Sequence, residues 1–176
     1  MSLIEITEAS HNIVLDMRYA TMNNFTNQQI YDSSRCFLRP EALYLLEKAI
    51  QLAEQQKLRF KIFDAYRPQY AQERLWSICP NSDYITPPER GSPHTRGIAL
   101  DLTLIDQNGQ ELDMGTPFDS FDITSHHGTT QISAEAALNR YKLLGIMMSA
   151  GWDLYVNEWW HYQLFNARQF DLIPNR

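Results

Sequence analysis

The chain has 176 residues, of which 44% are hydrophobic and 20% are charged, and its formal net charge is -6 at pH 7. This length fits one domain over residues 1–176, and an acidic chain without a basic run is a poor partner for nucleic acid or an anionic membrane. No apolar stretch reaches the roughly 18 residues that cross a bilayer, and residues 1–10 lack the basic and apolar regions of a secretory signal. Cys36 and Cys79 fit a reducing compartment, although one bridge between them stays open. We therefore expect a cytoplasmic protein.

The first half of the chain predicts one long helix and one strand. Residues 1–37 show no clear hydrophobic period. Over residues 40–56, a proline at the first helical position precedes apolar residues at helical spacing, namely Leu43, Leu46, Ile50 and Ala53. Residues 58–64 alternate between apolar and charged side chains, which indicates a half-buried strand. Pro68 forces Arg67 into an extended geometry and opens a short helix that runs to Trp76.

The second half predicts a long loop, a hairpin, a helix and a last strand. Residues 78–93 are rich in proline and form a loop, and long loops in compact domains are often functional. Residues 98–105 are the clearest strand, followed by a turn at 106–109 into residues 110–114. Ser133 caps a helix that ends at Gly151, and its expected buried face is Ala137, Tyr141, Leu144 and Met148. Residues 158–164 are rich in aromatic side chains and predict a strand.

This order of elements favours an α+β fold with a largely antiparallel sheet and helices packed on it. The chain lacks a strict βαβ alternation and a glycine-rich phosphate loop, which argues against a nucleotide-binding fold.

One pair of chemically suggestive residues lies at the start of the clearest strand. His94 and Asp101 are seven positions apart, so an ideal strand places them on opposite faces. Pro93 before His94 and Gly97 after it disfavour an ideal strand there. A loop or bulge at this point therefore brings the imidazole back over the Asp101 face.

A second pair, Glu158 and His161, needs a similar irregularity. Three positions share a face on a helix but not on a regular strand, so we expect a bulge or turn beside Glu158. His94, Asp101 and His161 would then offer two nitrogens and one oxygen, a ligand set that zinc accepts with one position left for water. Glu158 would act as general base and Arg67 would stabilise an oxyanion.

The residue types alone leave a simpler, structural role open for each of these residues. A histidine is more often structural than a metal ligand. Asp101 could form only an ion pair with Arg96. Arg67 could only pair with Asp64 or cap a helix, and Glu158 could be a surface carboxylate. The adjacent His126 and His127 point apart in an extended chain, so we favour a structural role over a second metal site.

Six blocks of the sequence resemble the VanX-type D-alanyl-D-alanine dipeptidases, zinc enzymes related to the VanY-type D,D-carboxypeptidases. The blocks occur in the family's order over nearly the whole chain, and their S-x-H-x-x-G-x-A-x-D and E-x-W-H elements are the most specific part. They are residues 16–21 (DMRYAT) with 24–26 (NFT) after them, 64–68 (DAYRP), 92–104 (SPHTRGIALDLTL), 114–119 (MGTPFD), 125–127 (SHH) and 158–162 (EWWHY).

The resemblance implies a D,D-peptidase or hedgehog-like zinc fold that hydrolyses D-Ala-D-Ala to free D-alanine with one zinc ion per chain. The metal ligands it implies are His94, Asp101 and His161. It implies Glu158 as general base and acid and Arg67 as the residue that stabilises the transition state. Three further residues would surround the substrate's amino end or backbone: Tyr19, Ser92 and Asp119. The loop at residues 78–90 is short for the family, and this difference is expected to alter access to the site.

Two other functions stay open at this stage. One is a D,D-carboxypeptidase that acts on longer cell-wall stem peptides, against which the absence of an export signal counts. The other is a zinc-stabilised binding domain without catalysis, against which the presence of both Glu158 and Arg67 counts. The expected partner is a small dipeptide, and the oligomeric state is left open.

Overall fold

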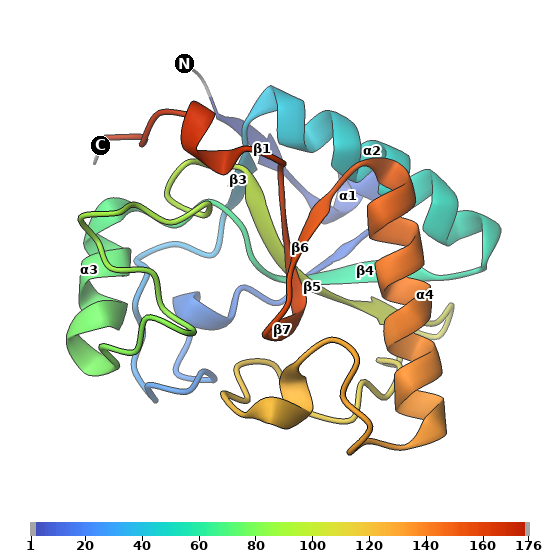
Figure 1. The fold of residues 1–176 in the computed structure, drawn as a ribbon. Coiled ribbons are helices and arrows are strands. Elements are labelled where there is room, and N and C mark those ends of the chain that lie inside the picture. Colours follow the sequence, from blue (N-terminus) through green and yellow to red (C-terminus); the bar gives the residue numbers. More distant parts are fainter. Residues whose placement is uncertain (1–2, 175–176) are drawn as a thin grey trace.

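Seven strands and four α-helices make up most of the regular structure in residues 3–174, the part of the chain that the computed structural model describes (Figure 1). The strands are β1 (Ile4–Ile6), β2 (Val14–Leu15), β3 (Cys36–Leu38), β4 (Arg59–Asp64), β5 (Ala99–Ile105), β6 (Asp153–Tyr155) and β7 (Glu158–Gln163). The helices are α1 (Glu8–His11), α2 (Pro40–Gln55), α3 (Gln69–Ile78) and α4 (Ala134–Ala150). The expected domain of residues 1–176 also includes residues 1–2 and 175–176, which lie outside the described residues.

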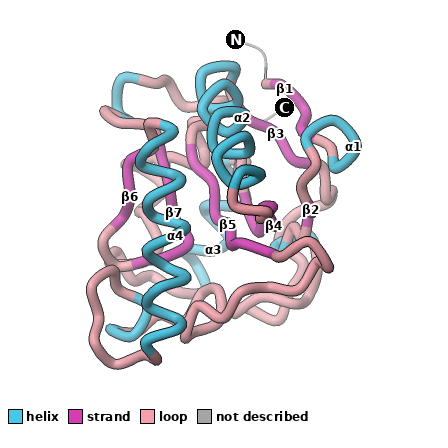
Figure 2. Tube along the Cα trace, turned by 90° about the vertical axis from the view of Figure 1, so that its right-hand side faces the viewer, coloured by secondary structure: helices cyan, strands magenta, loops and turns pink. Residues whose placement is uncertain are grey.

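The central sheet has the strand order β2-β4-β5-β7-β6, and β1 pairs with β3 in a separate two-stranded sheet. The pairs β4–β5, β5–β7 and β6–β7 are antiparallel, whereas β2 and β4 are parallel. Helices α2 and α4 cover one face of the central sheet, and α3 with the long loops lies on the other side (Figures 1 and 2). The predicted α+β fold with a largely antiparallel sheet is confirmed.

The predicted helices and strands from residue 40 onward are present with small shifts at their ends, except for the second strand of the hairpin, and the short strand β6 was not predicted. The first 38 residues instead contain elements that the sequence did not reveal: β1, α1, β2 and β3. Each is only two to four residues long, which is too short for a hydrophobic period to show. The turn at residues 106–109 forms, but the segment after it pairs only through a single bridge between Ile105 and Glu111.

The strand β5 is buried along its whole length because it lies at the middle of the sheet. Leu100, Leu102 and Leu104 belong to the main hydrophobic core together with buried residues of α2 and α4. Asp101 alternates with these leucines and therefore points to the other face of the sheet. The fold thus places one carboxylate on the side of α3 and the loops.

Helix α4 buries a different face from the one that the sequence indicated. Ser133 caps it and Gly151 ends it as expected, with φ +107° at the glycine. However, Tyr141 is 59% exposed and Met148 is 40% exposed, so the predicted face is wrong. The buried face contains polar as well as apolar side chains: Ala136, Asn139, Arg140, Leu143, Ile146, Met147 and Ala150. These polar residues bind loop carbonyls, which periodicity cannot anticipate.

Arg140 closes the loop that connects β5 to α4. Its guanidinium donates from Nε to the carbonyl of Met114 at 2.7 Å and from Nη1 to the carbonyl of His126 at 3.3 Å. It also lies over the ring of Trp159, 5.7 Å from the ring centroid. One buried cation therefore holds both ends of residues 114–126 against the helix.

Replacing Arg140 by Ala is expected to lower the free energy of unfolding by about 2–3 kcal/mol, because the buried carbonyls lose their donor. Urea denaturation measures this change. Lys142→Ala removes a positive charge from the exposed side of the same helix and is expected to change the free energy by less than about 0.5 kcal/mol. Equal stability of the two variants would contradict the role given to Arg140.

Both cysteines are free, so the single bridge left open by the sequence does not form. Within residues 3–174, no helix has the length and apolar character needed to cross a membrane.

Candidate active site

Strand register brings two of the three expected metal ligands together. Asp101 on β5 is paired directly with His161 on β7, so their side chains lie on the same face of the sheet. His94 lies in a turn just before β5, where the amide of Gly97 donates to the carbonyl of His94 at 2.9 Å. Gly97 has φ +69°, and a Cβ on it would lie 2.8 Å from a side-chain carbon of Leu3. The predicted turn that carries His94 over Asp101 is confirmed.

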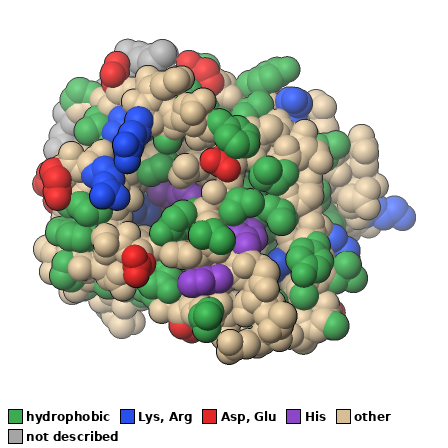
Figure 3. All heavy atoms as spheres, viewed as in Figure 1, with side chains coloured by type: hydrophobic (Ala, Val, Ile, Leu, Met, Phe, Trp, Pro, Cys, Tyr) green, Lys and Arg blue, Asp and Glu red, His purple; other side chains and the backbone are tan. Residues whose placement is uncertain are grey.

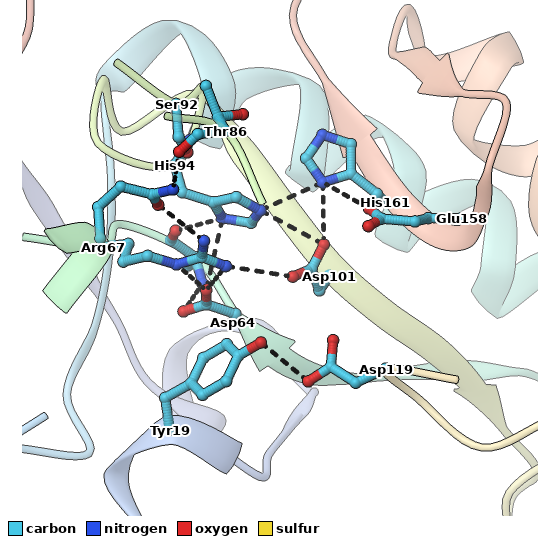
Figure 4. A network of polar contacts seen from close by, with 12 residues as sticks. Tyr19, Asp64, Arg67, Thr86, Ser92, His94, Asp101, Asp119, Glu158 and His161 are labelled. Atoms are coloured by element: carbon cyan, nitrogen blue, oxygen red, sulfur yellow. Dashed lines mark hydrogen bonds and ion pairs between the residues drawn. The ribbon is translucent and has the colours of Figure 1, made fainter. Parts of the chain in front are cut away.

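The three expected ligand atoms form a small buried triangle, called the metal-ligand triangle below (Figure 4). Nε2 of His94 lies 3.2 Å from Nδ1 of His161 and 3.4 Å from Oδ1 of Asp101, and Nδ1 of His161 lies 3.0 Å from the same oxygen. A tetrahedral zinc ion with bonds of about 2.0 Å separates its ligands by about 3.3 Å. The spacing of these atoms therefore fits one small cation.

The other nitrogen of each imidazole faces an oxygen. Nδ1 of His94 lies 2.7 Å from the carbonyl oxygen of Ala65, and Nε2 of His161 lies 3.0 Å from Oε1 of Gln163. Each of these nitrogens donates its proton to that oxygen, which leaves Nε2 of His94 and Nδ1 of His161 unprotonated. Two lone pairs and a carboxylate then face one another, and a cation relieves their repulsion. The donor set thus fits a metal ion.

Glu158 lies beside the triangle without belonging to it. Leu154 pairs with Tyr162 but the next residue, Tyr155, pairs with Glu158, so β7 is irregular between these positions, as predicted. Oε2 of Glu158 lies 3.8 Å from Nδ1 of His161. Burial raises the pKa of the Glu158 carboxyl well above its usual range, and the charge of Asp101 adds to this effect. A buried carboxyl with a high proton affinity suits a general base.

Arg67 is fixed at the site by Asp64, so the simpler alternative for this residue also proves correct. Nε and Nη2 of Arg67 donate to Oδ2 of Asp64 at 3.0 and 2.8 Å, and Nη1 donates to Gln72 at 2.8 Å. The same Nη2 lies 3.9 Å from Oδ2 of Asp101. The ion pair with Asp64 therefore orients the guanidinium toward the metal-ligand triangle.

Arg96 does not pair with Asp101, which corrects the alternative considered for that carboxylate. Its guanidinium donates to the backbone carbonyls of Phe170 and Arg90 instead. Asp101 has the two imidazoles as its close partners because the strand register delivers them to it.

Two of the three expected substrate-binding residues contact each other. The hydroxyl of Tyr19 donates to Oδ2 of Asp119 at 2.8 Å, although 100 positions separate them in the chain. Asp119 has φ +61°, which a non-glycine residue adopts only at a cost. Burial and then the charge of Asp101 raise the pKa of the Asp119 carboxyl well above its ordinary value. A cationic ligand beside Asp119 would lower this pKa and stabilise the carboxylate.

Ser92 lies on the opposite side of the triangle from Tyr19 and Asp119 (Figure 4). It is buried, and its hydroxyl oxygen accepts a hydrogen bond from the amide of His94 at 3.0 Å. All eight expected site residues line one cavity of about 360 Å³: Tyr19, Arg67, Ser92, His94, Asp101, Asp119, Glu158 and His161. This volume is within the range of small-molecule sites, about 300–1,000 Å³.

The adjacent histidines do not build a second metal site. Among residues 3–174, His94, Asp101 and His161 form the one group of three potential protein ligands close enough to share an ion. Nε2 of His126 lies 3.4 Å from the hydroxyl of Tyr84. Burial, followed by the charge of Arg140, lowers the pKa of His127 to about 4. The structural role favoured from the sequence fits these surroundings.

Sequence reasoning missed the residues that hold the site residues in place. Gln163 orients His161, Gln72 supports Arg67, and the hydroxyl of Tyr31 donates to Oδ1 of Asp64 at 2.6 Å. For Gln163, the position two residues after His161 on the same strand was the only available signal.

An α+β fold that gathers two imidazoles and a carboxylate around one buried point, with another carboxyl beside them, has the site of a metal-dependent hydrolase. Comparison with known proteins agrees with this class. The family model described as D-ala-D-ala dipeptidase, of peptidase family M15, matches residues 1–175. The chain belongs to this family of metallopeptidases, as the sequence motifs indicated.

Individual relatives are similar over most of their length. A D-alanyl-D-alanine dipeptidase of Escherichia coli (strain K12) is 37% identical over 174 residues, which cover 99% of this chain and 90% of the relative. Proteins of the same name from Enterococcus faecium and Streptomyces coelicolor are 35% and 32% identical, each over 90% of this chain and 89% of the relative.

Proposed function

We propose that the chain hydrolyses D-Ala-D-Ala to two molecules of D-alanine with one zinc ion held by His94, Asp101 and His161. The observation that carries this proposal is the convergence of Nε2 of His94, Nδ1 of His161 and a carboxylate oxygen of Asp101 on one point. Family membership supports the substrate, and the nitrogen and oxygen donors support zinc. The two free cysteines support a cytoplasmic location.

A bound zinc ion supplies Lewis-acid chemistry, since it lowers the pKa of a water molecule to about 7 and polarises a carbonyl oxygen. The carboxylate of Glu158 takes a proton from the attacking water as the new C–O bond forms at the scissile carbonyl. Glu158 then gives that proton to the amine nitrogen as the C–N bond breaks. One carboxyl thus serves as base and acid in turn.

Arg67 and the substrate-binding residues act on the charges of the dipeptide. The guanidinium of Arg67 stabilises the oxyanion that develops at the carbonyl, because Asp64 and Gln72 already fix its orientation. Asp119, with Tyr19, binds the ammonium group, which compensates the buried carboxylate. Ser92 contributes a hydroxyl to the substrate backbone.

Assay of the free dipeptide beside a pentapeptide that ends in D-Ala-D-Ala tests the substrate. The proposal predicts release of D-alanine from the dipeptide at a far higher kcat/KM. Comparable rates on both peptides would favour the D,D-carboxypeptidase alternative. Metal-containing protein that cleaves neither peptide would favour a binding domain without catalysis.

The Arg67→Lys variant is expected to lower kcat by about 100-fold with unchanged metal content, because one ammonium cannot bind Asp64 and the oxyanion together. Steady-state kinetics and elemental analysis measure the two quantities. Arg74→Lys, on the exposed side of α3, is the matched control. A kcat within a factor of about two of the control would show that Arg67 does not act on the transition state.

A further inference from the structure

The cavity has opposite charges at its two ends. Asp119 and Tyr19 lie on one side of the metal-ligand triangle and Ser92 on the other (Figure 4). Ser92 follows Arg90 and Gly91 in the chain, and Arg90, Arg96 and Arg168 all line the cavity. Figure 3 shows Lys or Arg side chains beside a hollow in which histidine is visible. An acidic end therefore faces a group of arginines.

Arg96 fixes the backbone on which the other two arginines lie. Its guanidinium donates to the carbonyl of Arg90 at 3.1 Å and to the carbonyl of Phe170, which directly follows the 3₁₀ helix Ala167–Gln169 that contains Arg168. Gly91, at φ +72°, packs so closely that a Cβ there would lie 3.0 Å from Nη2 of Arg96. Two segments that are far apart in the sequence are thus held together at the mouth of the cavity.

The side chains of Arg90 and Arg168 are exposed. Within residues 3–174, no hydrogen bond or ion pair engages either guanidinium. Burial lowers the pKa of Arg96, and the nearby charges of Arg168 and Arg39 lower it further, whereas Asp171 opposes them. Like charges gathered at the rim of a cavity create a positive potential that attracts an anion.

We propose that Arg90 and Arg168 bind the terminal carboxylate of the dipeptide. This inference rests on the proposed function, whose substrate is a zwitterion with an ammonium group at one end and a carboxylate at the other. The dipeptide, which spans at most about 7 Å, binds in the cavity that Asp119, the triangle and both arginines line together. A guanidinium matches the planar carboxylate with two parallel hydrogen bonds.

The opposite charges at the two ends of the cavity also fix the direction in which the dipeptide binds. With its ammonium at Asp119 and its carboxylate at the arginines, the scissile amide lies over the triangle and beside Glu158. The reversed orientation places like charges together at both ends. Arg90 and Arg168 are therefore specificity-determining residues for a free C-terminus on the leaving half.

A double variant and a pair of substrates test this role. Arg90→Ala/Arg168→Ala is compared with Lys48→Ala/Lys142→Ala, which removes the same charge from exposed positions outside the cavity. Each is assayed on D-Ala-D-Ala and on its C-terminal amide. For the free acid, kcat/KM is expected to fall by about 10- to 100-fold in the arginine variant, mainly through KM. For the amide, and for the lysine variant, the change is expected to stay below about twofold.

An equal loss on acid and amide, or no loss on the acid, would overturn the assignment. Calorimetric titration of both ligands into proteins that also carry Glu158→Gln gives a readout that needs no turnover. Weaker binding of the acid alone in the arginine variant supports the inference, and equal binding in all variants refutes it. Failure of the unmodified enzyme to cleave D-Ala-D-Ala would instead refute the proposed function.

Discussion

Glu158→Gln is expected to lower kcat for D-Ala-D-Ala by about 10³-fold while zinc content stays unchanged. Glu158 is buried and lies 3.8 Å from Nδ1 of His161, so it is a neighbour of the metal-ligand triangle. The amide has nearly the same shape as the carboxylate but accepts no proton from the attacking water. Release of D-alanine and elemental analysis of the same preparation measure the two quantities.

Glu135→Gln, in the first turn of α4, gives the matched control because it makes the same chemical change at a residue that does not line the cavity. Its kcat is expected to equal that of the unmodified enzyme. Retention of most of the activity by Glu158→Gln would remove this residue from the proton transfer. Loss of zinc from the same variant would make it a ligand, contrary to the geometry.

The second large effect concerns the ligands themselves. Replacement of His94, Asp101 or His161 by Ala is expected to remove both zinc and detectable hydrolysis, because two ligands do not hold the ion. The melting temperature of each variant should no longer respond to added zinc, whereas that of the unmodified protein should rise. Chelation of the unmodified protein should reproduce the loss of activity, and readdition of zinc should restore it.

Gln163→Leu supplies a graded test of the same site. It removes the oxygen that fixes the tautomer of His161 but leaves all three ligands in place. We expect zinc affinity to fall by about 10- to 100-fold, with hydrolysis recovered at saturating zinc. An unchanged affinity would show that the hydrogen bond from His161 to Gln163 does not prepare the ligand.

Local chemistry in the sequence indicated that His94, Asp101 and His161 lie together, and the family resemblance implied that they are the metal ligands. Asp101 inside an apolar strand was unusual, and Pro93 with Gly97 indicated the turn that places His94 above it. The spacing of Glu158 and His161 required an irregular strand, which the pairing of β6 with β7 contains. The substrate and the family came from motif resemblance rather than from spacing.

What the sequence did not reveal depends on contacts between distant segments. Apolar residues lie on several sides of α4, so only its partners decide that Arg140 is buried and Tyr141 exposed. Likewise, the cluster of Arg90, Arg96 and Arg168 exists because the 3₁₀ helix near the C-terminus packs against the loop before β5. No hydrophobic period or motif within one segment predicts such a contact between distant segments.

Crystallographic data collected on both sides of the zinc absorption edge test the central claim most directly. One anomalous peak per chain is expected, within about 2.0–2.2 Å of Nε2 of His94, Nδ1 of His161 and a carboxylate oxygen of Asp101. A peak bound to other residues, or active protein with no peak at this position, would contradict the account.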